Sequence, residues 1–330
     1  MILRTAVVGV GYLGRFHAQK YASLPNSHLV GVADPSAAAR SAVAAELGVA
    51  AYADYHELLG HVDAVSIVTP TPLHYGVAKD FLDAGANVLV EKPMTVTVAE
   101  GESLIELAHR ANRILQVGHL ERFNAAVLAL QPSLTVPRFI ESARLAPFKH
   151  RGTDVDVVLD LMIHDIDLIL SIVRSPVIGV DAIGSSIFSA EVDIANARLR
   201  FANGCVANAT ASRVSLKTER KLRVFQDDAY LSVDLQQKVL TVIRKGEGVG
   251  ADGMPQVAIA EEIYEQGDAL KAEIIAFLDS AATGCAPPVS GEDGLLALRT
   301  AVSITEQVAS SRRQFSQPGA GTLSRAGTDG

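Results

Sequence analysis

The sequence has no tryptophan and only two cysteines among its 330 residues. Cys205 and Cys285 belong to no CxxC motif and to no Cys/His cluster. This usage excludes a disulfide framework and a structural zinc site as expectations, and it fits a reducing compartment. We therefore expect a cytoplasmic protein without a bound metal.

Long apolar runs without charge and an excess of basic residues are also missing. The most apolar long run, residues 157–173, contains Asp160, His164, Asp165 and Asp167, which a lipid-facing helix does not tolerate. The 37 acidic residues outnumber the 29 basic ones, and the net charge of −8 argues against nucleic acid or an anionic membrane as the main partner. No basic region or cleavage site begins the chain, so no targeting signal is assigned. We expect a small-molecule ligand.

From residue 1 to about 120, short apolar runs alternate with segments of helical length. The apolar runs are residues 6–8, 29–33, 64–68, 88–90 and 114–117. The helical segments are residues 13–24, 36–47, 73–84 and 98–112. This repeated strand–helix pattern predicts an α/β domain with a doubly wound parallel sheet, a Rossmann domain, over residues 1–120.

Residues 121–316 change to a pattern in which strands dominate and predict a separate α+β domain. The predicted helices are residues 123–130, 155–173, 268–282 and 294–311, and the predicted strands are 139–145, 194–201, 206–211, 222–225, 230–233 and 239–243. These strands favour a mostly antiparallel sheet. Residues 246–255 are interpreted as a mobile loop, and 317–330, rich in Gly, Ser and Thr, as a disordered tail.

A dinucleotide fingerprint follows the first predicted strand. In the GxGxxG pattern, Gly9 permits a tight turn, Gly11 lets the backbone approach a pyrophosphate, and Gly14 allows close helix packing. Asp34 ends the next strand, where its carboxylate accepts hydrogen bonds from ribose hydroxyls and repels a 2′-phosphate. The pattern predicts NAD rather than NADP, and a purely structural turn is the alternative. The candidate cofactor-binding residues here are Gly9, Gly11, Tyr12, Leu13, Gly14 and Asp34.

Two further motifs follow the fourth and fifth predicted strands, at the carboxyl ends where open α/β sheets bind ligands. They add Thr69, Pro70, Thr71, His74, Glu91 and Lys92 to the cofactor-binding candidates. We interpret Lys92 as an ammonium held beside the nicotinamide, since a buried run precedes it and Pro93 fixes the chain after it. A solvated surface lysine is the alternative. For His74, a helix-capping or surface imidazole is the competing interpretation.

The predicted helix 155–173 carries its polar residues on one side. At about 100° per residue, one narrow stripe holds the side chains of Asp156, Asp160, His164, Asp167 and Ser171. A polar face that simply meets water is the alternative. Asp160 and His164, spaced i and i+4, would present a carboxylate and an imidazole together, as general-base catalysis requires. Asp165 points to the apolar side and is interpreted as a structural carboxylate.

These motifs together resemble the glucose-fructose oxidoreductase/inositol dehydrogenase/rhizopine (Gfo/Idh/MocA) family of nicotinamide-dependent sugar oxidoreductases, over about residues 3–312. The resemblance is carried by the segments 9–14, 69–74, 91–93, 116–124 and 160–165. It implies that Lys92, Asp160 and His164 are the catalytic residues and that Arg122 and Phe123 contact substrate. It also implies that the second domain has an open sheet through which a homodimer or homotetramer forms. One departure is residues 156–159, where many members carry a Gly-rich run.

Within the family, residues 121–124, 144–149 and 151–154 resemble the branch that oxidises the 3-hydroxyl of UDP-N-acetylglucosamine. Lys149 and Arg151, with Arg144 on the preceding strand, are basic groups that a diphosphate would bind. A solvated loop is the alternative. The expected function is therefore NAD-dependent oxidation of a secondary hydroxyl of a UDP-sugar. A free-polyol dehydrogenase of the inositol 2-dehydrogenase type and a non-catalytic NAD-binding sensor remain the rival functions.

Overall fold

The computed structural model describes residues 1–148, 155–249, 253–265 and 267–315. Its first sheet is six-stranded and entirely parallel, in the order β3-β2-β1-β4-β5-β6. The strands are β1 (Leu3–Val8), β2 (Ser27–Ala33), β3 (Ala50–Tyr52), β4 (Ala64–Ile67), β5 (Asn87–Glu91) and β6 (Leu115–Gly118). The helices are α1 (Tyr12–Ser23), α2 (Ala37–Leu47), α3 (His74–Asp83) and α4 (Val98–Ala111). This order confirms the predicted Rossmann domain.

The central strands of this sheet are apolar because helices cover both faces. Every residue of β4 is buried, as are all residues of β5 except Glu91 at its end. Strands buried on both sides read as continuous hydrophobic runs, which is why the sequence located them well. The sheet's order reverses between β1 and β4, and the loops at the carboxyl ends of these two strands meet there.

The second sheet has eight strands in the order β14-β13-β12-β11-β7-β10-β9-β8, with β7 and β10 as its parallel pair. The strands are β7 (Pro137–Leu145), β8 (Val177–Ser185), β9 (Ile194–Phe201), β10 (Val206–Ser212), β11 (Glu219–Gln226), β12 (Ala229–Asp234), β13 (Val239–Val249) and β14 (Pro255–Ile263). The helices of this half of the chain are α5 (Ala125–Leu130), α6 (Ile163–Val173), α7 (Ala269–Thr283) and α8 (Gly291–Phe315). The mostly antiparallel sheet of the prediction is confirmed.

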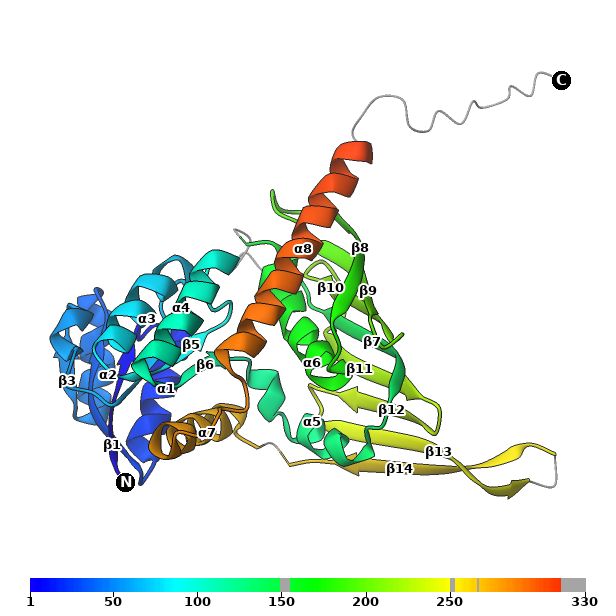
Figure 1. Cartoon of the computed structure of the whole chain (residues 1–330), viewed down its shortest axis with the longest axis horizontal. Helices are drawn as coiled ribbons and strands as arrows, with labels where there is room; N and C mark the ends of the chain where they lie inside the picture. The colour runs from blue at the N-terminus through cyan, green and yellow to red at the C-terminus, as the bar shows by residue number, and fades with distance from the viewer. Residues whose placement is uncertain (149–154, 250–252, 266, 316–330) are drawn as a thin grey trace.

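The eight-stranded sheet has one covered face and one open face. Helices α6 and α8 lie against the covered face (Figure 1), where Ala195, Ala197 and Leu199 of β9 are fully buried. The intervening residues of β9, Asn196 and Arg198 among them, are exposed on the other side. Alternation of this kind is typical of an antiparallel sheet with one solvated face.

The prediction of a mobile loop at residues 246–255 is wrong for most of the described residues in that range. Strand β13 continues to Val249 and β14 begins at Pro255, so the two form a long hairpin that projects from the sheet (Figure 1). Their pairing is irregular between Lys245 and Val249. Backbone pairing forms this hairpin without an alternating apolar pattern, and the sequence therefore gives little signal for it. The predicted disordered tail, 317–330, lies outside the described residues.

Helix α7 returns to the first domain, although the sequence suggested that it belongs to the second. Its buried residues Ile274 and Phe277 share one core cluster with Val7 of β1 and Tyr21 of α1. Figure 1 shows α7 beside α1, close to the N-terminus. Helix α8 then contacts both α4 in the first domain and α6 in the second. By contacting both domains, α8 holds the Rossmann domain against α6 and the turn that precedes it.

Candidate active site

The loop between β1 and α1 has the form that a dinucleotide pyrophosphate requires. Gly9 has φ +85°, and a Cβ there would lie 2.7 Å from the carbonyl carbon of Val68. A Cβ on Gly14 would overlap the carbonyl oxygen of Gly9, so both positions need glycine. Within the described residues, no atom lies within 4 Å of the Cβ position of Gly11, and no side chain caps the start of α1. The N–H groups at a helix N-terminus suit an anion.

Asp34 is anchored at the end of β2. Its Oδ2 accepts a hydrogen bond from the N–H of Val10 at 2.9 Å, and its Oδ1 accepts one from the N–H of Ser36 at 2.8 Å. Each carboxylate oxygen keeps a lone pair for a ribose hydroxyl. A pocket of about 360 Å³ adjoins it, lined by Gly9, Asp34, Thr69 and Leu73 among others. These residues fit the adenosine half of NAD.

Other candidates surround this pocket or support it. Tyr12 is 70% exposed at the start of α1, and Thr71 begins a short 3₁₀ helix that leads into α3. His74 is buried, which excludes the competing interpretation as a surface imidazole. Its Nε2 lies 2.8 Å from the carbonyl oxygen of Thr69 and its Nδ1 2.9 Å from that of Pro93. The imidazole therefore joins the loop after β4 to the loop after β5.

Lys92 and Asp160 meet across the two domains. The Lys92 Nζ donates to the carbonyl oxygen of Asp160 at 2.8 Å and lies 3.8 Å from its carboxylate Oδ1. Burial lowers the pKa of Lys92, while the negative charges of Asp160 and Glu91 oppose this shift. The side chain of Lys92 remains 19% exposed, and that of Asp160 39%. The predicted ammonium is thus partly desolvated but reachable by a ligand.

His164 lies in the field of this ammonium. Burial holds the pKa of His164 well below its ordinary value, and the positive charges of Lys92 and Arg144 add to the effect. Within the described residues, the buried Nδ1 of His164 has no hydrogen-bond partner. The imidazole is therefore neutral at pH 7, the form in which a general base accepts a proton.

The segment carrying Asp160 and His164 is not the single α-helix expected from residue 155. A π-helical turn spans Val158–Met162 and leads into α6. Just before this turn, the Oδ1 of Asp156 accepts a hydrogen bond from the Val158 N–H at 2.7 Å. Of the five polar residues of the predicted stripe, Asp167 is buried, and the other four are partly exposed.

Two buried ion pairs hold Asp167 of that stripe, Asp165, and the basic residues near them. The guanidinium of Arg122 donates to Asp167 at 2.6 and 2.7 Å. Arg144, 4% exposed, donates to Asp165 at 2.7 and 3.1 Å and to Glu121 at 2.9 Å. Asp165 is therefore the structural carboxylate that was predicted. Arg144 is not available to a diphosphate, which corrects the expectation from sequence, and Arg122 is already paired.

The remaining substrate candidates divide between described and undescribed residues. Phe123 is buried at 8% exposure and packs in the core of the first domain. Lys149 and Arg151 lie outside the described residues. Within the described part of the chain, no three His, Cys, Asp or Glu side chains are arranged to hold a metal ion. Among the same residues, no helix is both long and apolar enough to cross a membrane.

Sequence reasoning missed a buried polar group next to Glu91. His17 of α1 is fully buried and contacts Glu91 and Ser66, which lie far away in sequence. The signal was present on α1, whose buried residues are Gly14, His17, Ala18 and Tyr21. Polar rings at two positions of an otherwise small and apolar face indicate internal hydrogen bonding.

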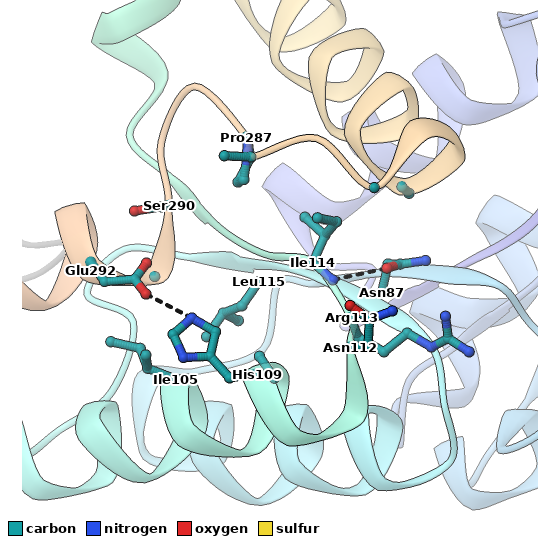
Figure 2. A pocket seen from close by; sticks show the side chains of 15 residues that line it. Asn87, Ile105, His109, Asn112, Arg113, Ile114, Leu115, Pro287, Ser290 and Glu292 are labelled. Atoms are coloured by element: carbon teal, nitrogen blue, oxygen red, sulfur yellow. Dashed lines mark hydrogen bonds and ion pairs between the residues drawn. The ribbon is translucent and has the colours of Figure 1, made fainter.

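A second pocket, of about 470 Å³, lies at the amino ends of strands in the Rossmann sheet, opposite the carboxyl-end loops. Figure 2 shows Asn87 and Leu115, at the amino ends of β5 and β6, facing Pro287 and Ser290 of the segment before α8. The ion pair of His109 with Glu292, at 2.9 Å, borders it. This pocket is separate from the carboxyl-end loops and is not part of the candidate active site.

The fold and the site together define a nicotinamide dinucleotide oxidoreductase. Residues 3–119 match the family described as "Oxidoreductase family, NAD-binding Rossmann fold", and residues 148–314 match "Oxidoreductase family, C-terminal alpha/beta domain". The chain belongs to the Gfo/Idh/MocA family of oxidoreductases. Its cofactor is NAD, as the fingerprint and Asp34 predicted.

The relatives of the chain differ in how similar their sequences are to it. The chain is 43% identical over 281 residues to a UDP-N-acetylglucosamine 3-dehydrogenase from Acidithiobacillus ferrooxidans, covering 85% of this chain and 89% of that one. A solved structure of that enzyme superposes with a TM-score of 0.89 at 40% identity, over 94% and 98% of the two chains. The myo-inositol 2-dehydrogenase of Thermotoga maritima is 28% identical over 315 residues, or 90% and 93% of the two chains.

Proposed function

We propose that the protein oxidises the 3-hydroxyl of UDP-N-acetylglucosamine or a related UDP-sugar, with NAD as the hydride acceptor. The observation that carries the catalytic part is the contact of the Lys92 ammonium with Asp160, beside a neutral His164. The similarity to the Acidithiobacillus ferrooxidans enzyme over 85% of the chain supports the substrate.

Each of the three side chains has a distinct proposed role. His164 accepts the proton of the substrate hydroxyl, which its low pKa permits at neutral pH. Lys92 donates a hydrogen bond to the same oxygen and stabilises the negative charge that develops there. Asp160 orients the Lys92 ammonium, which it contacts through both its carbonyl and its carboxylate. NAD, when bound, receives the hydride from the carbon.

The variant His164→Asn tests this assignment. We expect turnover to fall about 100-fold or more, because asparagine cannot accept the hydroxyl proton, while NAD affinity stays nearly unchanged. Steady-state kinetics and a fluorescence titration with NADH measure the two quantities. Near-normal turnover of the variant would remove His164 from the mechanism.

Two alternative functions have to be excluded. The similarity to the more distant myo-inositol 2-dehydrogenase supports a free polyol as the alternative substrate. The other alternative is a non-catalytic NAD sensor, which would bind the cofactor without turning over any sugar. With Arg144 and Arg122 held by carboxylates, Lys149 and Arg151 are the proposed diphosphate ligands.

A thermal-shift panel with NADH and UDP-sugars, UDP, inositol or glucose separates these cases. A ligand at about 100 times its Kd adds about 2.7 kcal/mol of stability. We expect UDP-N-acetylglucosamine to stabilise the protein. Stabilisation by inositol or glucose, and by no UDP-sugar, would favour the polyol dehydrogenase, while tight NADH binding with no sugar response would favour the sensor.

The proposed assembly is a homodimer or homotetramer formed through the open face of the eight-stranded sheet. That face exposes Asn196 and Arg198 of β9, where a second copy would find a broad surface. Light scattering coupled to gel filtration gives the mass, and a monomer at micromolar concentration would contradict the proposal. The proposed compartment is the cytoplasm, which fits the free thiols of Cys205 and Cys285.

A further inference from the structure

A series of buried hydrogen bonds connects Tyr21, on α1, to the backbone N–H of Lys92. The Tyr21 hydroxyl lies 2.8 Å from the Oγ of Ser66, which lies 3.2 Å from the Nδ1 of His17. The Nε2 of His17 lies 3.1 Å from the Oε1 of Glu91. The other Glu91 oxygen accepts a hydrogen bond from the Lys92 N–H at 3.3 Å. Tyr21, Ser66 and His17 are all fully buried.

The partners fix the direction of this chain. An ionised Glu91 can only accept, so His17 must donate from Nε2. The Ser66 hydroxyl lies between the Nδ1 of His17 and the Tyr21 hydroxyl and joins the imidazole to Tyr21. Burial raises the pKa of Tyr21, so its hydroxyl keeps the proton that starts the chain.

The pocket for Glu91 is built for a carboxylate. A Cβ on Gly118 would lie 3.0 Å from the carboxyl carbon and from both oxygens of Glu91, so the glycine leaves room for this group. Burial raises the pKa of Glu91, but the hydrogen bond from His17 and the charges of His17 and Lys92 outweigh it, and the net shift is downward. Glu91 therefore stays ionised inside the protein.

We propose that Tyr21, Ser66 and His17 form a positioning chain that keeps Glu91 ionised, and that Glu91 in turn keeps the Lys92 ammonium charged in the active site. This inference rests on the proposed catalytic role of Lys92. The three residues touch neither substrate nor cofactor in this scheme, and they act through Glu91.

The other charged groups near these hydrogen bonds do not take over the effect of Glu91 on the Lys92 ammonium. Besides Glu91, the groups that act on Lys92 are Asp160, which also favours its charged form, and Arg144, which opposes it. Glu273 of α7 faces Glu91, but burial and the Glu91 charge raise the pKa of Glu273 well above its ordinary value, which favours its uncharged form. Glu91 also acts on the imidazoles of His74 and His119, whose pKa values burial lowers.

The titration of Lys92 tests the inference directly. The rate of acetylation of Lys92 by acetic anhydride, followed by mass spectrometry against pH, gives its titration midpoint without requiring turnover. The pH profile of kcat/KM gives the same midpoint through its basic limb. We compare His17→Leu, which removes the donor at similar volume, with His17→Gln, whose amide can still donate to Glu91.

We expect His17→Leu and Glu91→Gln to move the Lys92 midpoint to lower pH by about one unit, and His17→Gln to restore most of it. In Lys92→Arg, the basic limb and its response to His17 should both disappear. An unchanged midpoint in His17→Leu and Glu91→Gln would overturn the proposal, even if activity falls. If His17→Leu does not fold, Glu91→Gln, which has nearly the same shape, decides alone. A shifted acetylation midpoint in a protein that turns over no UDP-sugar would uphold this inference and contradict the proposed function.

Discussion

Glu273 of α7 should make the stability of the protein fall as pH rises. The residue is fully buried, and neither carboxyl oxygen has a hydrogen-bond partner among the described residues. Burial and the nearby charge of Glu91 raise its pKa well above the ordinary 4.5. The folded protein therefore holds a proton that the unfolded chain releases once the pH exceeds that value.

The magnitude follows from proton linkage. Between the unfolded and the folded pKa of Glu273, the free energy of unfolding decreases by about 1.4 kcal/mol for each pH unit. This contribution is fully present below the unfolded pKa and is lost as pH rises toward the folded one. The variant Glu273→Gln cannot ionise and lacks this slope. For each pH unit of that interval, the variant should therefore gain about 1.4 kcal/mol of stability on the wild type.

Urea unfolding at pH 5, 6, 7 and 8 measures this difference, with thermal unfolding as a second readout. Glu306→Gln is the matched control, because Glu306 is exposed on α8 and its loss should leave the pH dependence unchanged. Wild-type and Glu273→Gln curves that run parallel over the whole range would refute the reasoning, since they would show that Glu273 does not hold its proton in the folded state.

Three further predictions concern the cofactor loop and the buried arginine. Asp34→Ser should lower the preference for NAD over NADP at least about tenfold, because it removes the carboxylate that repels a 2′-phosphate, and separate titrations with the two cofactors measure this. Gly14→Ala should abolish measurable NADH binding, because its Cβ would overlap the carbonyl oxygen of Gly9, and unchanged fluorescence titration would contradict the described loop. Arg144→Met should cost about 3–5 kcal/mol in urea unfolding, because it leaves the Asp165 charge buried without its partner, and a loss below about 1 kcal/mol would show that the pair is not desolvated.

The Rossmann domain could be predicted closely because its signals are local. Helix α4 begins at Val98, with Thr97 and Glu100 forming a capping box, and it ends before Asn112 in a left-handed conformation. Such caps and buried strands depend on residues that are neighbours in sequence. The spacing of Gly9, Gly11 and Gly14 located the cofactor loop for the same reason.

At the candidate site, what the sequence missed includes contacts between distant residues. Arg144 was expected to face a diphosphate, but it pairs with Asp165 on a helix 21 residues away. His17 and Glu91 are separated by 74 positions, so no local pattern connects them. Sequence identifies a side chain as basic or acidic, but the partner that neutralises it depends on how the elements pack.

The return of α7 to the Rossmann sheet has a consequence for synthesis of the chain on the ribosome. Ile274, Phe277 and Leu278 belong to the same core cluster as Val7 and Val10, which are made more than 250 residues earlier. At about 5–20 residues per second, the newly made strands wait roughly eight to thirty seconds after β6 for this helix. During that interval one apolar face of the nascent domain lacks its cover. A chaperone that shields apolar surface would have its longest contact with this protein there, and a stop codon placed before Ala269 would leave that face permanently open.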